Sequence, residues 1–170
     1  MPLKIFLIGL PGSGKSTLGK QLAHALKLPF VDLDDAIENH CNLSISEIFK
    51  SKGEDWFREM EAHILRSVAE ETESFVMATG GGSPCFYEGI DFMNRVGTTI
   101  FLDVSLTTIA QRLSQLEKSA RPLFNKVSNL GEALQQLQQG RVSYYRKAKL
   151  ILKEDEIEAN QILEKLSFKK

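Results

Sequence analysis

The residues with the clearest chemical meaning lie at positions 9–17, which read GLPGSGKST. Glycines at this spacing let the main chain turn tightly, so that successive N–H groups point inward as a nest for phosphate oxygens. Lys15 would place a cation near the β- and γ-phosphates of a nucleotide, and the Ser16 hydroxyl would bind Mg²⁺. A plain glycine turn beside a solvated lysine would not need Lys and Ser at these fixed positions. The stretch therefore predicts a phosphate-binding loop.

Two segments must position this loop. Residues 3–8 form an apolar run that predicts a short buried strand, and Leu18, Leu22 and Leu26 recur at the spacing of a helix over 15–27. A strand, a glycine-rich turn and a helix are the context that such a loop requires. The helix adds free N–H groups and the positive end of its dipole to the site.

Carboxylates follow two further predicted strands. Asp32 and Asp34 come after residues 28–31, and alternation along an extended segment would turn both to one side. One could hold Mg²⁺ through water, and the other could orient an acceptor hydroxyl or take its proton. Two alternatives stay open: Asp34 or Asp35 could instead cap a helix that begins at Ala36, and Asp103 is a rival metal group.

Three glycines and several arginines are also candidate ligand-binding residues. Gly80, Gly81 and Gly82 follow a predicted strand at 75–78 after the single residue Thr79, which suggests close approach of the main chain to a ligand rather than a flexible turn. Arg58 has Glu54 and Glu61 at i−4 and i+3, which is also the pattern of a surface ion-pair ladder. Arg121 precedes a proline in a polar segment and could contact phosphate or be a solvated loop residue, and Arg141 could be an ordinary exposed cation.

The order of elements predicts the fold class. Short apolar strands at 3–8, 28–31, 75–78, 98–102 and 150–152 alternate with helices at 15–27, 36–40, 55–70, 88–95, 105–116, 132–147 and 157–166, and Ser44 with Glu47 forms a capping box for one more. This alternation indicates an α/β protein with a five-stranded parallel sheet in a three-layer α/β/α arrangement. Ligands then bind at the carboxyl ends of the strands.

The composition and charge of the chain indicate which classes of molecule it could bind. The 170 residues suit one domain, 1–170, and a net charge of −1 without a basic stripe argues against nucleic acid. No apolar run reaches membrane-spanning length and no leader pattern is seen, so we expect a cytoplasmic protein that does not bind membranes. Cys41 and Cys85 are far apart and suggest neither a disulfide nor a zinc site.

Taken together and in this order, the motifs resemble those of the shikimate kinase family, which belongs to the nucleoside-monophosphate-kinase-like group of P-loop enzymes. The resemblance covers nearly the whole chain. It rests on residues 9–17, Asp32-Leu33-Asp34, Phe57-Arg58-Glu59-Met60-Glu61, Gly80–Gly82, Arg121-Pro122-Leu123 and Arg141-Val142-Ser143-Tyr144-Tyr145-Arg146.

The resemblance implies a P-loop kinase fold with a lid at about 114–129, shikimate-binding helices at about 34–70, and transfer of the γ-phosphoryl group of ATP to the 3-hydroxyl of shikimate. It assigns catalysis to Asp34, Lys15 and Arg121, and shikimate binding to Asp34, Arg58, Gly81 and Arg141. ATP would contact Gly12, Ser13, Gly14, Lys15, Ser16, Thr17, Arg112 and Arg121, with Arg112 beside adenine. Ser16 and, through water, Asp32 would hold Mg²⁺, the cofactor. Such a kinase, with ATP and shikimate as its ligands, is expected to be a monomer.

Two features depart from the family pattern. The segment between Arg112 and Arg121 is slightly long, and residues 153–156 are acidic where many relatives carry a basic adenine-contacting loop. The adenine contacts after the last strand are therefore left unassigned. The sequence leaves two alternative functions open. One is a gluconate-kinase-like or nucleotide kinase of the same fold, and the other is a nucleotide-binding regulator that phosphorylates no metabolite.

Overall fold

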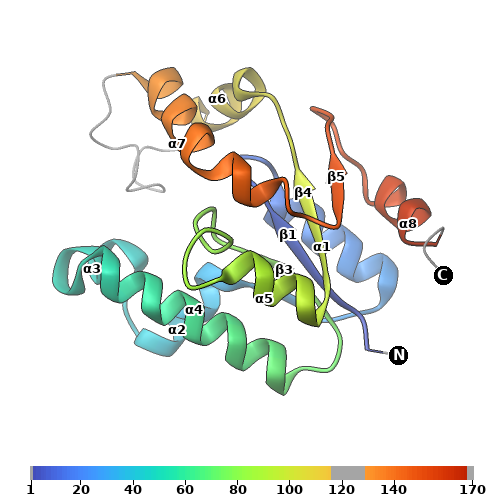
Figure 1. Cartoon of the computed structure of the whole chain (residues 1–170), viewed down its shortest axis with the longest axis horizontal. Coiled ribbons are helices and arrows are strands. Elements are labelled where there is room, and N and C mark those ends of the chain that lie inside the picture. Colours follow the sequence, from blue (N-terminus) through green and yellow to red (C-terminus); the bar gives the residue numbers. More distant parts are fainter. Residues whose placement is uncertain (1, 116–128, 168–170) are drawn as a thin grey trace.

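The computed structural model describes residues 2–115 and 129–167 (Figure 1). Its centre is one parallel sheet of five strands in the order β2-β3-β1-β4-β5. The strands are β1 (Lys4–Ile8), β2 (Phe30–Asp32), β3 (Phe75–Ala78), β4 (Thr98–Leu102) and β5 (Leu150–Leu152). The predicted fold class is thus confirmed.

The order of the strands reverses at β1, which lies between β3 and β4 in the sheet. Ile5 pairs with Val76 of β3 on one side and with Thr98 of β4 on the other. In sheets of this kind, ligands bind beyond the carboxyl end of the strand where the order reverses. The glycine-rich loop begins at the end of β1, so the topology places it at this position.

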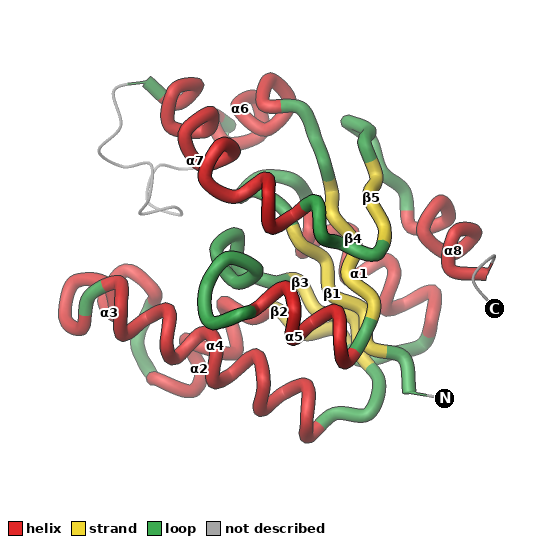
Figure 2. The backbone as a smooth tube through the Cα atoms, viewed as in Figure 1, coloured by secondary structure: helices red, strands yellow, loops and turns green. Residues whose placement is uncertain are grey.

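Helices cover both faces of the sheet (Figures 1 and 2). On one side lie α1 (Lys15–Leu26) and α8 (Ala159–Ser167), which pack against each other; on the other lie α5 (Gly89–Val96) and α7 (Leu130–Tyr145). Because both faces are covered, residues 5–8 of β1 and 75–77 of β3 are fully buried, which explains their uninterrupted apolar runs. The remaining helices are α2 (Leu33–Cys41), α3 (Ile45–Lys52), α4 (Glu54–Glu71) and α6 (Leu106–Ser114).

Helices α2, α3 and α4 pack together as a subassembly beside the β2 edge of the sheet. The capping box predicted at the start of α3 is present: Glu47 N donates to Ser44 Oγ (3.2 Å), and Ser44 N donates to Glu47 Oε2 (2.8 Å). The predicted start of α2 at Ala36 is wrong. The helix begins at Leu33, because Asp32, the last residue of β2, is itself the N-cap and accepts a hydrogen bond from Asp34 N.

None of the helices in the described part of the chain is both long and apolar enough to cross a membrane. Most of the expected lid, at 116–128 and including Arg121, lies outside the described residues.

Candidate active site

The loop after β1 forms a cradle of main-chain amides. Gly9, Gly12 and Gly14 have φ angles of 148°, 82° and 93°, in the region that side chains disfavour, and Gly14 is the N-cap of α1. A Cβ atom on Gly9 would lie only 3.0 Å from the carbonyl oxygen of Leu102 and 3.1 Å from Ser13 Oγ. The glycines are therefore required by geometry, and the amides of the first turn of α1, which carries Ser16 and Thr17, open toward the cradle.

The Lys15 ammonium group folds back over this cradle. Its Nζ donates hydrogen bonds to the carbonyl oxygens of Gly9 and Leu10, both at 2.9 Å. The side chain thus holds a positive charge at the mouth of the loop, where phosphate oxygens would bind. Lys15 thus lies beside the loop, and its contact with the β- and γ-phosphates stays a prediction.

Ser16 and Asp32 meet beside the loop. Ser16 Oγ donates to Asp32 Oδ2 at 2.6 Å, although the two residues lie on α1 and at the end of β2. A hydroxyl and a carboxylate side by side suit a hard cation that takes its other ligands from water and phosphate. Asp103, the rival metal group, instead lines a separate pocket with Val142 and Arg146.

Asp34 reaches the site by a route that the sequence does not predict. The expectation that Asp32 and Asp34 alternate along one strand is wrong, because Asp34 lies in the first turn of α2. Asp34 still faces the glycine triplet: its Oδ1 lies 3.4 Å from the position that a Cβ atom on Gly80 would take. The alternative that Asp34 or Asp35 is the N-cap is also wrong, since Asp32 has that role.

The glycine triplet brings the charged groups together. A Cβ atom on Gly80 would collide with Glu61 Oε1, one on Gly81 would lie 2.8 Å from Arg141 Nη1, and one on Gly82 would lie 2.7 Å from Arg58 Cζ. Each glycine therefore makes room for a different ionised side chain. A flexible turn does not describe this segment, because the two guanidinium groups lie against consecutive residues of it.

Arg58 is held in a buried network on α4. It is 5% exposed, and its Nη1 donates to Oε2 of Glu61, which is 2% exposed, at 3.0 Å. Glu61 Oε1 accepts from Ser83 Oγ at 2.6 Å, so the buried carboxylate is used on both oxygens. The outer partner, Glu54, accepts from Arg58 Nε and Nη2. The ion pairs expected of a surface ladder do form, but a buried guanidinium with a fixed inner partner is a built site rather than a solvated face.

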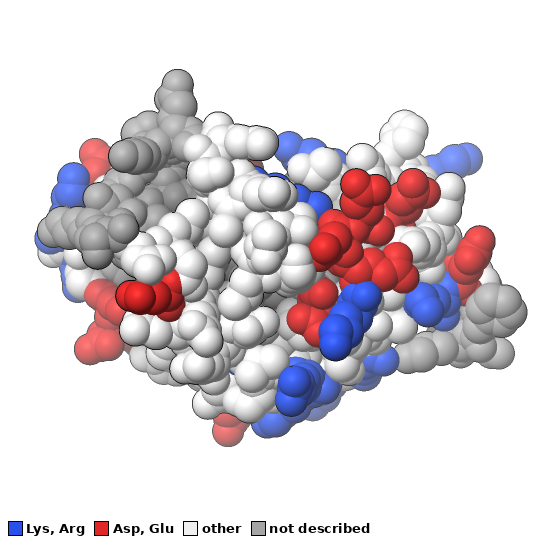
Figure 3. All heavy atoms as spheres, turned by 90° about the horizontal axis from the view of Figure 1, so that it is seen from above, with Lys and Arg blue, Asp and Glu red and all other residues white. Residues whose placement is uncertain are grey.

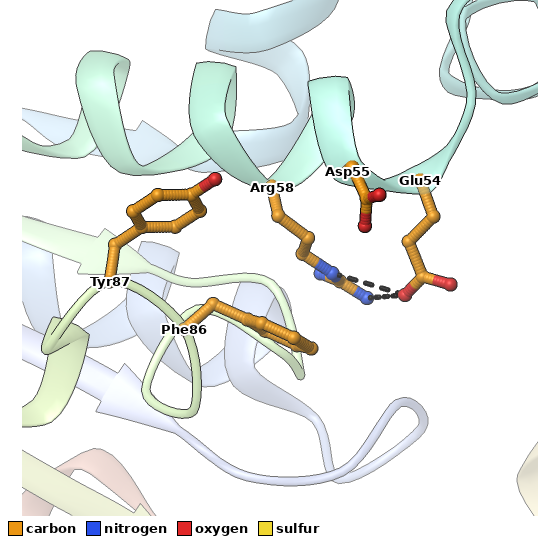
Figure 4. A pocket seen from close by; sticks show the side chains of 5 residues that line it. All are labelled: Glu54, Asp55, Arg58, Phe86 and Tyr87. Carbon is orange, nitrogen blue, oxygen red and sulfur yellow. Dashed lines mark hydrogen bonds and ion pairs between the residues drawn. The ribbon is translucent and has the colours of Figure 1, made fainter.

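Arg58 also lines a pocket of about 440 Å³ (Figure 4). The other lining residues are Glu54, Asp55, Phe86 and Tyr87. The ring of Phe86 lies 4.7 Å from Arg58 Cζ, so aromatic carbon covers a face of the guanidinium group. Ser83, Phe86 and Tyr145 are site residues that sequence reasoning missed; of these, only Tyr145 gave a signal, through its place four residues after Arg141.

Tyr145 fixes the middle glycine. Its hydroxyl donates to the Gly81 carbonyl oxygen at 2.5 Å, and its side chain is fully buried. Burial raises the pKa of the Tyr145 phenol well above its ordinary value, against the opposing effect of the Arg141 guanidinium. Burial likewise raises the pKa of the nearby Cys85 thiol to about 11. Both groups therefore stay protonated at neutral pH, and Tyr145 remains a hydrogen-bond donor.

Replacing Tyr145 with phenylalanine should lower the free energy of unfolding at pH 7 by about 1–2 kcal/mol, because the Gly81 carbonyl loses its donor. The raised pKa gives this bond a pH dependence. The unfolded phenol ionises above about pH 10 while the folded one resists, so the wild type loses stability as the pH rises past that point. Tyr145→Phe should lose less stability over this range, because only the contribution of the Cys85 thiol, whose pKa is also raised, remains. Urea unfolding at a series of pH values measures both effects, and Tyr144→Phe, at a 37% exposed neighbour, is the control.

Arg112 connects the cradle to the segment after β5. Its Nη2 donates to the Asp155 carbonyl oxygen at 2.8 Å, and its Nη1 approaches the Gly12 carbonyl oxygen at 3.4 Å. The Asp155 carboxylate accepts from Ser105 N (2.9 Å), and this bond is the main cause of its lowered pKa. The acidic segment at 153–156 is thus anchored beside Arg112, and acidic side chains gather on this face (Figure 3).

Comparison with known proteins agrees with this geometry. A family model described as shikimate kinase matches residues 11–168. A shikimate kinase from Bacteroides fragilis (strain ATCC 25285) is 42% identical over 164 residues, covering 95% of this chain and 90% of the relative. The crystal structure of shikimate kinase from Bacteroides thetaiotaomicron superposes with a TM-score of 0.90 at 37% identity and covers 99% of both chains. Shikimate kinase from Acinetobacter baumannii in complex with shikimate gives 0.87 at 30% identity, covering 98% of this chain and 91% of that one. The chain belongs to the shikimate kinase family.

Proposed function

We propose that this protein transfers the γ-phosphoryl group of ATP to the 3-hydroxyl of shikimate, giving shikimate 3-phosphate. The observation that carries the proposal is the glycine triplet, against which Asp34, Arg141 and Arg58 converge. Two guanidinium groups match the carboxylate of a small acid, and a nearby aspartate matches its ring hydroxyls. Membership of the shikimate kinase family supports the same acceptor.

The part of the site that would bind ATP positions the phosphates and neutralises their negative charge. Phosphoryl transfer requires the reacting oxygens in line and the developing charge neutralised, with little covalent chemistry from the protein. Amides of residues 12–17 would hold the β- and γ-phosphates, and Lys15 would face the oxygen that accumulates charge. We assign Arg112 to the adenine side of the site, and Arg121, in the proposed lid at about 114–129, to the phosphates.

Mg²⁺ fits the pair formed by Ser16 and Asp32. Mg²⁺ requires six oxygen ligands in octahedral geometry and keeps several waters, so one hydroxyl and one carboxylate suffice beside phosphate. Among the described residues no group of three or more His, Cys, Asp or Glu side chains could hold a metal alone. A cation here would therefore come with the nucleotide, whose negative charge it would neutralise.

On the acceptor side, Asp34 would orient the 3-hydroxyl and accept its proton as the phosphoryl group moves. Arg58 and Arg141 would fix the carboxylate, and the Gly81 main chain would contact the ring between them. We assign this acceptor site to the helices at about 34–70, in a single domain over 1–170. ATP as co-substrate and two free cysteines, Cys41 and Cys85, support a cytoplasmic location, and we propose that the enzyme works as a monomer.

An acceptor panel tests the proposal. Purified protein with ATP and Mg²⁺ should release ADP in proportion to added shikimate, and shikimate 3-phosphate should appear by mass spectrometry. Gluconate and nucleoside monophosphates should leave ADP release at its background. Preference for either of those acceptors would replace the proposed function with the corresponding kinase activity. Tight ATP binding without any acceptor-dependent turnover would instead support a regulatory module.

Gly82→Ala should raise the KM for shikimate by about tenfold, the effect of losing one charge-assisted hydrogen bond. The added Cβ would lie 2.7 Å from Arg58 Cζ and push the guanidinium group aside. Gly140→Ala is the matched control, because its Cβ would meet no atom within 4 Å although Gly140 precedes Arg141. Steady-state kinetics with shikimate as the varied substrate measure both, and an equal KM in the two variants would contradict the assignment of Arg58.

A further inference from the structure

The Arg58 guanidinium is already bound along the edge that a carboxylate ligand would use. Nε and Nη2, the edge that carboxylates bind with two parallel hydrogen bonds, both donate to Glu54 Oε1, at 3.3 and 3.2 Å. Nη1 donates to Glu61. Figure 4 shows Glu54 beside this edge at the rim of the pocket, with Phe86 beneath the guanidinium group. An incoming acid therefore meets Glu54 on the donors that it needs.

The two glutamates that hold Arg58 differ in how firmly they are placed. Glu61 is buried, is fixed by Ser83 on its other oxygen, and lies against Gly80. The Glu54 side chain is 58% exposed and belongs to the first residue of α4, directly after Gly53. Glu54 can therefore move into water without leaving an unpaired buried charge, whereas Glu61 cannot.

The hydrogen bonds from Arg58 to Glu54 are also weaker than good charge-assisted hydrogen bonds. One Glu54 oxygen receives both donors, at distances longer than the roughly 2.7–2.9 Å of good charge-assisted bonds. A carboxylate with two free oxygens can make two shorter parallel bonds to the same edge. Aromatic rings lie over the guanidinium group, with Phe86 at 4.7 Å and Phe57 at 5.2 Å from Cζ, so an acid has to approach along an edge.

We propose that Glu54 is an internal competitor for the acid-binding edge of Arg58, which the carboxylate of the acceptor must displace. This inference rests on the proposed function for the identity of the acid. Glu54 keeps the guanidinium group oriented before the acceptor binds, and it lowers the net affinity for every acid that needs this edge. It is a positioning residue that sets acceptor affinity and takes no part in the transfer of the phosphoryl group.

Calorimetric titration with shikimate, without ATP, tests the proposal. Glu54→Gln keeps the length of the side chain but removes the competing charge, so the Kd for shikimate should fall about two- to fivefold. Glu54→Ala should shift it in the same direction. The matched control is Asp55→Asn, which removes one negative charge from the same pocket and the same helical turn; within the described residues, Asp55 makes no hydrogen bond to Arg58. Its Kd should change less than that of Glu54→Gln.

Shikimate methyl ester separates competition from general electrostatics. The neutral ester does not compete with Glu54 for a charged edge, so Glu54→Gln should improve binding of the acid more than that of the ester. Weaker shikimate binding by Glu54→Gln, an equal gain from Asp55→Asn, or an equal gain for the ester would each overturn the proposal. If the wild type binds shikimate but releases no shikimate-dependent ADP, the proposed function fails and the Kd comparison still decides the role of Glu54. Failure of the wild type to bind shikimate would overturn both.

Discussion

Asp34→Asn is expected to lower kcat for shikimate phosphorylation by about 10²- to 10⁴-fold, the range for loss of a positioned general base. Asparagine has nearly the same shape and can still hydrogen-bond a ring hydroxyl, so KM for shikimate should change far less. The structure supports this assignment because Asp34 Oδ1 faces Gly80, in the triplet that also meets Arg58 and Arg141. Steady-state kinetics with shikimate as the varied substrate would measure the loss.

Asp35→Asn provides the control for Asp34. It removes the same charge from the same first turn of α2, so it loses a similar favourable interaction with the helix dipole. In the wild type, the pKa of the Asp35 carboxyl is raised, chiefly by partial burial and then by the nearby carboxylates of Asp32 and Glu38, so these three residues form an acidic cluster beside Asp34. A kcat loss of equal size in both variants would point to the charge of the cluster. A kcat near that of the wild type in Asp34→Asn, with a raised KM, would reduce Asp34 to orienting the hydroxyl.

Much of the fold could be predicted because each strand is a short apolar run between helices of clear periodicity. The phosphate-binding loop at 9–17 helped to place the first strand and the first helix, because its chemistry requires a strand before it and a helix after it. The junction of β2 and α2 was misplaced for a specific reason. Asp32 ends the strand, caps the helix and receives the Ser16 hydroxyl, and the last of these contacts joins residues 16 positions apart.

The acceptor side could be predicted only in part from the residues themselves. Spacing on α4 correctly paired Arg58 with Glu54 and Glu61, but burial decides what such pairs mean. That burial depends on Ser83 and the glycine triplet, which approach from another segment of the chain, with Ser83 lying 22 positions from its partner Glu61. Tyr145 was harder still, because its partner Gly81 is 64 positions distant. Local periodicity contains no information about contacts between residues so far apart in the sequence.

Lys15→Met is expected to lower kcat by about 10²- to 10³-fold, the usual effect of removing one preorganised group that stabilises transition-state charge. The Lys15 ammonium lies over the cradle, where its hydrogen bonds to the Gly9 and Leu10 carbonyl oxygens hold it in place before any phosphate binds. Methionine keeps much of the length of the stem but removes the charge and the donors. Kinetics with ATP and shikimate varied in turn would show the loss in kcat with little change in KM for shikimate.

Lys20→Met separates this effect from a general loss of positive charge. Lys20 lies on the same helix and is exposed, and its Nζ lies 5.8 Å from the centre of the Phe30 ring, away from the cradle. We expect kcat in that variant to stay near the wild-type value, because charge at a solvated surface is screened and does not touch the phosphates. An equal fall in both variants would mean that Lys15 acts through the overall field of the helix. A fall in Lys15→Met together with lost thermal stability would show that the lysine chiefly holds the loop carbonyls; stability close to that of the wild type is therefore part of the expected result.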